Sequence, residues 1–354
     1  MSVSASNPEY VNARVRSRRA SLFADDEYRK LVRMGPSAIA RFMEETEYER
    51  EINALGARFS GVDLIEYALN RNLAKHFDDL LDWSEGRLYD LISRYLRKFD
   101  VWNVKTIIRG IYTESDPEEI RTDLIRAGEL EDRTIDQLLE VETVEDAIEV
   151  LSGTIFADSL TDAYEEFEQT GALVPLENAL DREFYEHLLE DVGQPYGEPM
   201  EGPEALYVEF LQAEIDFRNL RNALRLARSG ADLDPGAYYI EGGTLFSQSE
   251  LSRLVGNEEE LVDHIAENER YAGRLSGALD RLRDADSLIQ FEHALDAALL
   301  EYSDTLSSIY PTSVSAVLSY ILAKEREVEN IRAIARGREV GLDESEIEEE
   351  LVIL

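Results

Sequence analysis

Three groups of polar residues recur along the chain, and each combines a carboxylate, an amide and a guanidinium. An acidic residue stands three positions before an Asn, a basic residue follows that Asn by two positions, and an Arg follows it by six. The three copies span residues 100–109, 216–225 and 327–336. Because a guanidinium can meet a carboxylate with two parallel hydrogen bonds, this combination is suited to holding helices together from the inside.

A second motif, Glu-x-Ala-Leu followed by Asn or Asp, precedes each of these segments. Its glutamates, Glu66, Glu177 and Glu292, are 111 and 115 residues apart, and the three asparagines of the first motif are 116 and 111 residues apart. Two independent motifs with one period indicate an internal threefold repeat. We therefore predict three homologous helical domains, at residues 1–112, 113–229 and 230–354.

A third pattern, Ile-x-x-Gly-x-Leu, occurs in the second and third copies, at residues 125–130 and 240–245. The first copy lacks it, which indicates that this copy is shorter or has diverged. The second copy has four or five extra residues, and the Gly- and Pro-rich stretch 193–203 is the predicted place for them.

Apolar residues recur at intervals of three and four, β-branched alternating runs are rare, and Pro is confined to a few positions, so the predicted fold class is all-α. Around each motif Glu the apolar residues fall within one arc of a helix. The predicted stripes are Val62, Ile65, Leu69, Leu73; Leu173, Leu176, Leu180, Phe184; Leu288, Phe291, Leu295, Leu299; and, around the first Asn, Val104, Ile107, Ile108, Ile111.

Each repeat is thus expected to form a long pair of helices that meet through apolar stripes with carboxylates at their edges. Asp100 is expected to point into its stripe, and Lys105 and Arg109 to share the opposite flank. An unpartnered buried carboxylate costs several kcal/mol, so we predict a structural polar clasp within or between repeats. Catalytic or ion-binding use is the alternative. The predicted clasp residues are Glu66, Asn103, Arg109, Glu177, Asn219, Arg225, Glu292, Asn330 and Arg336.

Known catalytic and cofactor motifs are absent from the sequence. There is no Cys, no phosphate-binding Gly-x-x-x-x-Gly-Lys-Ser/Thr loop and no Gly-x-Ser-x-Gly. The four histidines, His76, His187, His264 and His293, lie outside the helical spacings of zinc and di-iron sites, and each is expected at the surface or at its boundary. We therefore predict no catalytic residue, cofactor, metal or small-molecule substrate.

The composition is strongly acidic, with 75 Asp and Glu against 36 Lys and Arg and a formal charge of −39. Only five of the basic residues are Lys. A dense carboxylate surface keeps a protein soluble in concentrated salt, which screens the repulsion between the charges. We interpret the charge as an adaptation to salt, and it disfavours binding to nucleic acid.

Two further expectations concern membranes. The first ten residues have neither a basic start nor an apolar stretch, so they do not predict a secretory signal, and the apolar run 314–323 is too short to span a bilayer. A basic cluster, Arg14, Arg16, Arg18 and Arg19, is expected to be an exposed or packed helix face, with anionic lipid or an acidic partner as the alternative. The acidic runs 258–260 and 344–350 are expected to be solvated helix faces.

The whole pattern resembles the C subunit of the archaeal A-type and bacterial V-type rotary ATP synthases, which is related to the d subunit of vacuolar ATPases. The resemblance rests on the opening Tyr10-x-x-Ala-Arg-Val-Arg16, on the three acid-x-x-Asn segments, and on the ending 311–337, which contains Pro-Thr-Ser, Leu-Ser-Tyr-Ile-Leu-x-Lys-Glu-x-Glu-Val-x-Asn-Ile-Arg and Arg-Gly. It covers nearly the whole chain. The replacement of Lys by Arg and the added surface acid fit a halophilic archaeon.

This resemblance implies a funnel of three helical domains around a pseudo-threefold axis. It also implies a non-catalytic rotor subunit on the cytoplasmic face of the cell membrane, bound peripherally. The implied partners are the proteolipid ring and the central stalk, between which the protein would transmit torque for ion-driven ATP synthesis. The repeat alone also fits an open superhelical stack, and a free-standing helical scaffold that binds other proteins is the alternative function.

Overall fold

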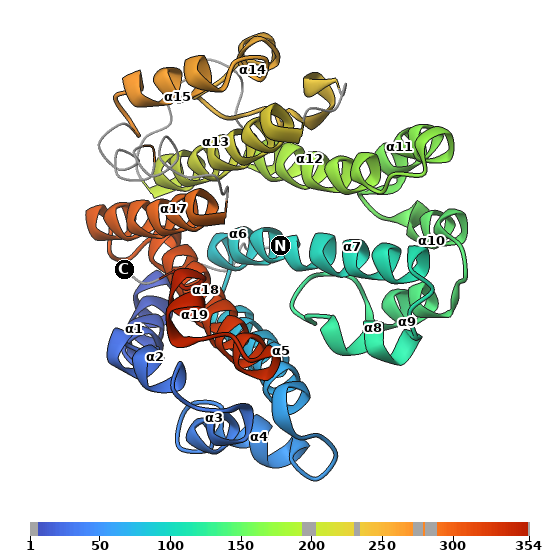
Figure 1. The fold of residues 1–354 in the computed structure, drawn as a ribbon. Helices are drawn as coiled ribbons and strands as arrows, with labels where there is room; N and C mark the ends of the chain where they lie inside the picture. The colour runs from blue at the N-terminus through green and yellow to red at the C-terminus, as the bar shows by residue number, and fades with distance from the viewer. Residues whose placement is uncertain (1–5, 193–202, 230–233, 272–278, 280–288, 353–354) are drawn as a thin grey trace. The chain divides into compact units, whose positions relative to one another are not determined.

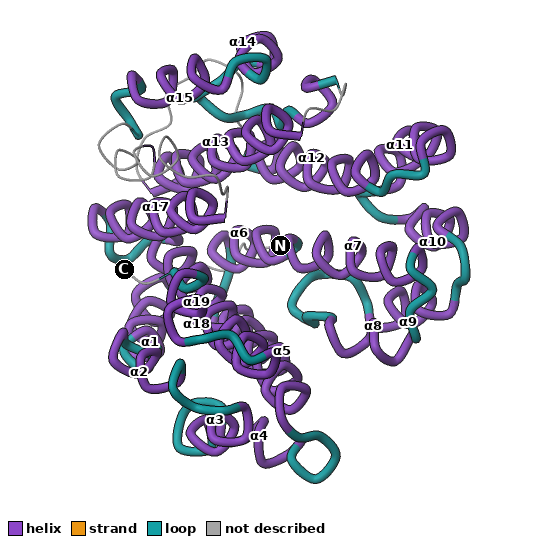
Figure 2. The backbone as a smooth tube through the Cα atoms, in the orientation of Figure 1, coloured by secondary structure: helices purple, strands orange, loops and turns teal. Residues whose placement is uncertain are grey.

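The computed structural model describes residues 6–192, 203–229, 234–271, 279 and 289–352. Every regular element within these ranges is a helix, as Figure 2 shows by its purple segments. The all-α prediction is therefore confirmed. The stretch predicted to hold the extra residues of the second copy, 193–203, lies outside the described residues except for its last position.

The chain forms two compact units, Met1–Glu140 with Ser307–Leu354, and Val141–Leu306. We call them unit 1 and unit 2. The three domains that we predicted, at residues 1–112, 113–229 and 230–354, have other boundaries than these two units, because they were drawn from the period of the sequence motifs. The three domains stay a prediction. The helices of unit 1 are α1 Pro8–Arg19, α2 Asp25–Leu31, α3 Pro36–Met43, α4 Glu49–Leu55, α5 Gly61–Trp83, α6 Arg87–Leu96, α7 Lys98–Tyr112, α8 Pro117–Asp123, α9 Asp132–Glu140, α18 Val314–Val340 and α19 Glu344–Glu349 (Figure 1).

Unit 1 is built around two long helices, α5 and α18. Helices α1 and α6 pack on both of them, and α3 and α4 cover α5. The predicted α5 stripe is fully buried here; Ile65 and Leu69, for example, have no exposed surface. We expected α5 to pair with the Asn-bearing helix of its own repeat, yet its main partner is α18, which carries the Asn motif of the third copy.

Unit 2 consists of the chain between these two parts of unit 1. Helix α12 packs along α11 and against α13, and α13 contacts α14 and a short 3₁₀ helix, η2. Its elements are α10 Val144–Val150, η1 Leu151–Gly153, α11 Ala157–Thr170, α12 Val174–Asp191, α13 Pro203–Ser229, η2 Pro235–Tyr238, α14 Gln248–Leu254, α15 Glu258–Glu267 and α17 Ile289–Ile309, whose last residues belong to unit 1.

The three repeated asparagines hold a later part of the chain through its backbone. The Asn103 amide donates to the Ile125 carbonyl and its Oδ1 accepts from the Ile125 N–H, both at 2.8 Å. Asn219 makes the same pair of bonds with Ile240, and Asn330 makes it with Val352. Since all three side chains are buried, each satisfies two backbone groups that would otherwise lack partners.

The acidic residue three positions earlier binds the same returning segment. Asp100 accepts from the backbone N–H groups of Glu129 and Leu130, at 2.7 and 3.1 Å. In unit 2, Asp216 accepts from Thr244 and Leu245, at 2.6 and 2.8 Å. Burial raises the pKa of Asp100 to about 6, and the two N–H donors oppose that rise. The carboxylates are thus held by backbone N–H groups and, at Asp216, also by the hydroxyls of Thr244 and Tyr271, where we expected arginines.

These contacts explain the Ile-x-x-Gly-x-Leu pattern. A Cβ atom on Gly128 would lie 1.9 Å from Asp100 Oδ1, and one on Gly243 would lie 2.3 Å from Asp216 Oδ1. The Ile binds the Asn, the Gly lets the backbone approach the carboxylate, and the Leu N–H is a donor. Each Ile-x-x-Gly-x-Leu segment therefore binds the Asn-bearing helix that precedes it in the sequence. This explains why the pattern first occurs after α7, the first of these helices.

Residues 337–354, after the third Asn motif on α18, contain no Ile-x-x-Gly-x-Leu segment, and the N-terminal part of the chain supplies donors to the acid of this motif. Glu327 accepts from the Phe23 N–H at 2.6 Å and from the Tyr48 hydroxyl at 2.7 Å. The N-terminal segment thereby completes a site on the C-terminal helix, and unit 1 contains both ends of the chain.

The glycine contact can be tested by adding a single methyl group. We expect Gly128→Ala to lower the free energy of unfolding by about 2–3 kcal/mol, because backbone or carboxylate must shift to relieve the overlap. Gly153→Ala is the matched control, since no atom lies within 4 Å of the added Cβ there. Thermal unfolding in molar KCl measures both, and equal midpoints would contradict this explanation.

Candidate functional site

A ladder of polar contacts joins α5 and α18 in unit 1. Arg336 donates to both carboxylate oxygens of Glu66, one contact being Nη2 to Oε2 at 3.0 Å. One turn away, Arg332 Nη2 donates to Asn70 Oδ1 at 2.6 Å. The contact moves four residues forward on α5 and four residues back on α18, as antiparallel helices require.

Unit 2 repeats this ladder between α13 and α17. Arg225 binds Glu292 through two parallel hydrogen bonds of 2.6 Å, and Arg221 donates to Asp296 at 2.5 Å. The residue spacings are the same as in unit 1. In both ladders the Glu motif of one copy meets the Arg positions of another copy, so the two motifs recur together because they form one interface.

The carboxylates of the ladders are much less exposed than the guanidiniums that cover them. The Arg336 and Arg225 side chains are each 58% exposed, whereas Glu66 is 14% and Glu292 is 20% exposed. Each Arg side chain therefore covers a carboxylate that has little contact with water. The positive charge of the guanidinium stabilises that carboxylate, while the other side of the guanidinium stays in solvent.

The nine predicted clasp residues do not form one type of cluster. The structure brings Glu66 to Arg336 and Glu292 to Arg225, and it places Asn103, Asn219 and Asn330 on backbone groups, where we expected carboxylate partners. Arg109 lies on α7 of unit 1 and Glu177 on α12 of unit 2.

A pocket of about 390 Å³ opens onto the unit 1 ladder. Arg332, Arg336 and Asn70 form part of its wall, and α7 contributes Trp102 and Arg109. Burial lowers the pKa of Arg332, so its guanidinium is poorly solvated. The sequence patterns did not predict this pocket, because its residues come from four separate helices.

A buried ion pair on α18 was also missed. Lys324 Nζ lies 2.7 Å from Glu327 Oε1 and 2.9 Å from the Tyr48 hydroxyl, and the side chains of both charged residues are at most 2% exposed. Burial lowers the pKa of Lys324, although Glu327 opposes the shift. One signal was available: a rare Lys lies three residues before an acid on the apolar side of a helix.

One of the four histidines lies in the protein interior. His76, expected at the surface or its boundary, is buried and contacts the Tyr320 hydroxyl through Nδ1, so that expectation was wrong. Burial lowers the pKa of this imidazole to about 2, so the ring stays neutral. The other described histidines are not buried to this degree.

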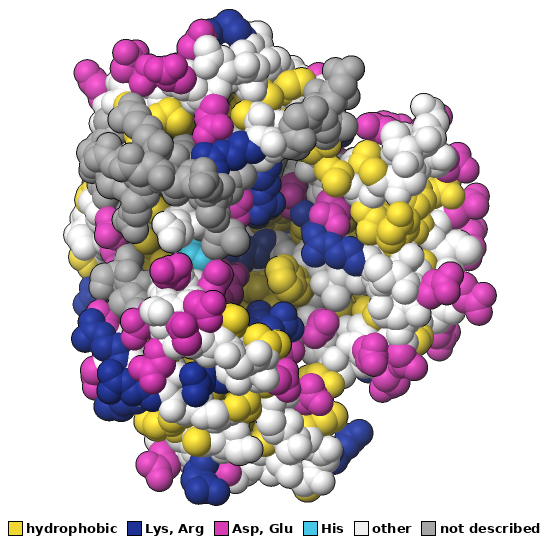
Figure 3. Space-filling model, viewed as in Figure 1, with side chains coloured by type: hydrophobic (Ala, Val, Ile, Leu, Met, Phe, Trp, Pro, Cys, Tyr) yellow, Lys and Arg dark blue, Asp and Glu magenta, His cyan; other side chains and the backbone are white. Residues whose placement is uncertain are grey.

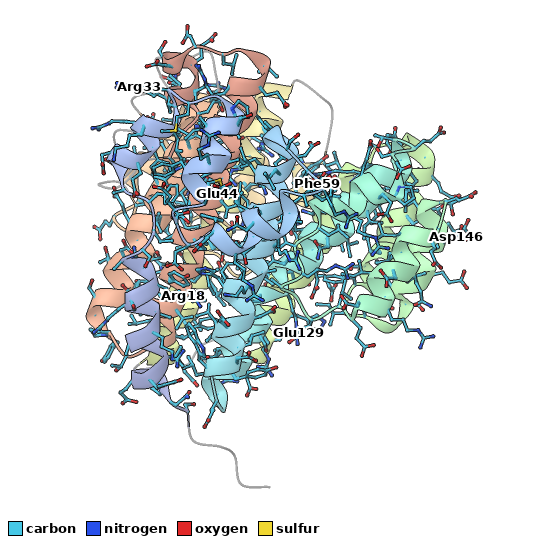
Figure 4. All side chains as sticks on the ribbon, turned by 90° about the horizontal axis from the view of Figure 1, so that it is seen from below. Arg18, Arg33, Glu44, Phe59, Glu129 and Asp146 are labelled. Atoms are coloured by element: carbon cyan, nitrogen blue, oxygen red, sulfur yellow. The ribbon has the colours of Figure 1, made fainter. Side chains whose placement is uncertain are left out.

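The basic cluster on α1 packs against neighbouring side chains and backbone. Arg14 lies over the rings of Tyr10 and Trp83, at 4.8 and 4.7 Å. Arg18, which Figure 4 labels, lies on the same helix and pairs with Asp79. Arg16 and Arg19 bond the Pro311 carbonyl and the Ser319 hydroxyl. These contacts support the packed-face interpretation over a lipid or partner site.

Asp and Glu side chains lie across the face of the molecule shown in Figure 3, with Lys and Arg in smaller groups. The run 258–260 is partly paired, because Arg228 binds Glu258 and Arg253 binds Glu260. In the part of the chain that the structure describes, no three His, Asp or Glu residues form a group suited to a metal ion. None of the described helices combines the length and apolar character needed to cross a bilayer.

Comparison with known proteins decides the family. Residues 11–350 match the family described as ATP synthase (C/AC39) subunit. This chain belongs to that family. A relative from Haloferax volcanii, named as the C subunit of an A-type ATP synthase, is 67% identical over 99% of this chain and 98% of its own. Relatives with the same name from Halorubrum lacusprofundi and Halobacterium salinarum are 63% and 58% identical over 99% of this chain and 99–100% of theirs.

The resemblance drawn from the repeated motifs and the C-terminal segment is thereby confirmed. These relatives come from halophilic archaea, as the acidic, Lys-poor composition predicted. A more distant relative with the same name, from Methanosarcina mazei, is 34% identical over 99% of this chain and 94% of its own.

The ladder can be tested with a double-mutant cycle on Glu66→Gln and Arg336→Ala. We expect a coupling of about 1 kcal/mol that largely survives molar KCl, because the carboxylate is mostly buried. The exposed pair Arg253 and Glu260 is the control, and its coupling should vanish in the same salt. Chemical unfolding of the four proteins of each cycle measures both values, and a coupling that is lost for both pairs would show that the ladder is only a surface pair.

The buried ion pair gives a second cycle. Lys324→Met leaves the Glu327 charge buried without its cation, so we expect a loss of roughly 3 kcal/mol in unfolding free energy. Lys324→Met with Glu327→Gln should cost less than the single change, because no buried charge remains. Lys30→Met, which breaks the exposed pair with Asp26, should cost less than about 0.5 kcal/mol. Urea unfolding would contradict this account if the double variant were the less stable one.

Proposed function

We propose that this chain is a non-catalytic central-rotor subunit of a rotary A-type ATP synthase. The observation that carries the proposal is the family match over residues 11–350, together with relatives named as the C subunit of A-type ATP synthases that align over nearly their whole length. In this role the chain binds peripherally on the cytoplasmic face of the membrane, joins the proteolipid ring to the central stalk, and transmits torque between them.

The proposed architecture is a funnel of three homologous helical domains, residues 1–112, 113–229 and 230–354, around a pseudo-threefold axis. Its support is the repeated chemistry within each unit: three Asn side chains that make the same pair of backbone bonds, and two ladders with the same register. Antiparallel helices with side-chain hydrogen bonds at two successive turns resist sliding along each other, and a part that transmits torque needs that stiffness.

No step of bond making is assigned to the chain. Its polar residues are used within the fold: the ladder carboxylates are covered by guanidiniums, and the buried acids accept backbone N–H groups. ATP synthesis then belongs to other subunits of the complex, and this chain couples them mechanically.

The test uses a haloarchaeal strain in which the gene for this chain has been deleted. We expect the stalk and catalytic subunits to leave the membrane fraction in that strain, while the proteolipid ring stays. A plasmid copy should return them and should restore ATP synthesis by energised vesicles. Mass spectrometry of membranes washed in molar KCl measures the distribution, and a full set of bound subunits without this chain would refute the proposed role.

Two plasmid-borne variants provide a matched comparison. Gly153→Ala should restore the bound subunits as the unchanged chain does. Gly128→Ala disturbs the segment 125–130, which binds α7 in unit 1. At the temperature where this variant begins to unfold, it should restore fewer of the bound subunits to the membrane. If the chain instead accumulates as a monomer with none of these subunits, the scaffold alternative takes the place of the rotor role.

A further inference from the structure

The two ladders differ at one position, and that position faces the pocket. In unit 2 both arginines meet carboxylates, Arg225 with Glu292 and Arg221 with Asp296. In unit 1 the place of Asp296 is taken by Asn70, a neutral amide. The unit 1 ladder therefore has one hydrogen-bonded carboxylate fewer than its counterpart, although the Asp123 carboxylate acts on both of its arginines electrostatically.

The guanidinium that meets the neutral amide belongs to Arg332, which is only partly exposed. Arg332 donates to Asn70, and its nearest carboxylates, on Glu66, Glu329 and Asp123, act on it electrostatically. Burial is the largest influence on its pKa and lowers it in spite of those carboxylates. A desolvated guanidinium is stabilised by a planar oxyanion that can accept two of its N–H groups.

Arginine is the more frequent charged residue in the lining of the pocket, where Arg336 is paired with Glu66. The charged residues of this lining are three arginines, Arg109, Arg332 and Arg336, and two acids, Glu119 and Asp123. The chain as a whole has 75 acids to 36 bases. Glu119 is exposed to solvent, where salt screens its charge.

The remaining lining suits a small organic acid or the end of an acidic side chain. Trp102 has 45% of its surface exposed and offers an apolar face beside the arginines. The hydroxyls of Thr106, Thr113 and Ser115 also line the pocket. A volume of about 390 Å³ lies within the size range of small-molecule sites.

We propose that this pocket binds a carboxylate, with Arg332 as its principal partner and Asn70 as the residue that leaves that guanidinium available. The carboxylate comes from a free di- or tricarboxylate or from an acidic side chain of another polypeptide. The site does not depend on the rotor role, because it is argued from side chains of unit 1 alone.

Trp102 provides a direct reporter of the pocket, since the chain has two Trp residues. In a Trp83→Phe background, which keeps an aromatic ring under Arg14, all Trp fluorescence comes from Trp102. Potassium citrate and a short polyglutamate peptide are titrated separately into this protein in KCl at constant ionic strength. We expect a saturable change with at least one of them; saturation by citrate shows that a free acid suffices, and saturation by the peptide alone shows that a polypeptide carboxylate is required.

The matched variants exchange the amide and the carboxylate between the ladders. Asn70→Asp supplies Arg332 with its own carboxylate and should weaken binding by about fivefold or more, and Arg332→Gln should weaken it similarly. Asp296→Asn makes the reverse change in unit 2 and should leave the titration unaltered. Melting temperatures show that each variant is folded. The proposal is overturned if neither probe saturates, or if Asn70→Asp binds as well as Asp296→Asn.

Discussion

The structure depends on how a highly acidic chain provides hydrogen-bond donors for the carboxylates that it buries. Three solutions are visible. Asp100 and Asp216 accept backbone N–H groups from a returning segment, Glu327 is held by Lys324, Tyr48 and the Phe23 N–H, and the ladder glutamates lie beneath half-exposed guanidiniums. Each solution ties two distant parts of the chain together, because at least one donor comes from a different helix or loop.

The need for hydrogen-bond donors also explains where the repeated motifs lie relative to one another in the sequence. An Asn-bearing helix is complete only when a later segment reaches back to it, which the Ile-x-x-Gly-x-Leu segments do for α7 and α13. At α18 the roles are divided: Val352 binds Asn330, while Phe23 and Tyr48 from the other end of the chain bind Glu327. A structural unit made of an Asn-bearing helix and the segment that binds it therefore runs from one copy of the sequence motifs into the next.

Much of this could be read from the sequence. The helical class follows from the apolar spacing, Asp100 lies inside its stripe as predicted, and the family follows from the motifs. The partners of the motifs could not be predicted, because periodicity shows which residues share a helix face and leaves open which helix that face meets. Glu66 therefore pairs with Arg336, 270 positions away. The pocket and the Lys324 pair depend in the same way on several helices converging, and no local pattern records that convergence.

Unit 1 consists of two stretches, residues 1–140 and 307–354, with unit 2 between them in the sequence. The order in which the units are synthesised therefore differs from the order in which they can be completed. The residues of unit 2 follow one another without interruption, so all of them are synthesised before residues 307–354 of unit 1. Until then α5 lacks its main partner α18, which helps to bury its apolar stripe in the finished structure. The first part of unit 1 therefore completes its core only after the whole of unit 2 has been synthesised.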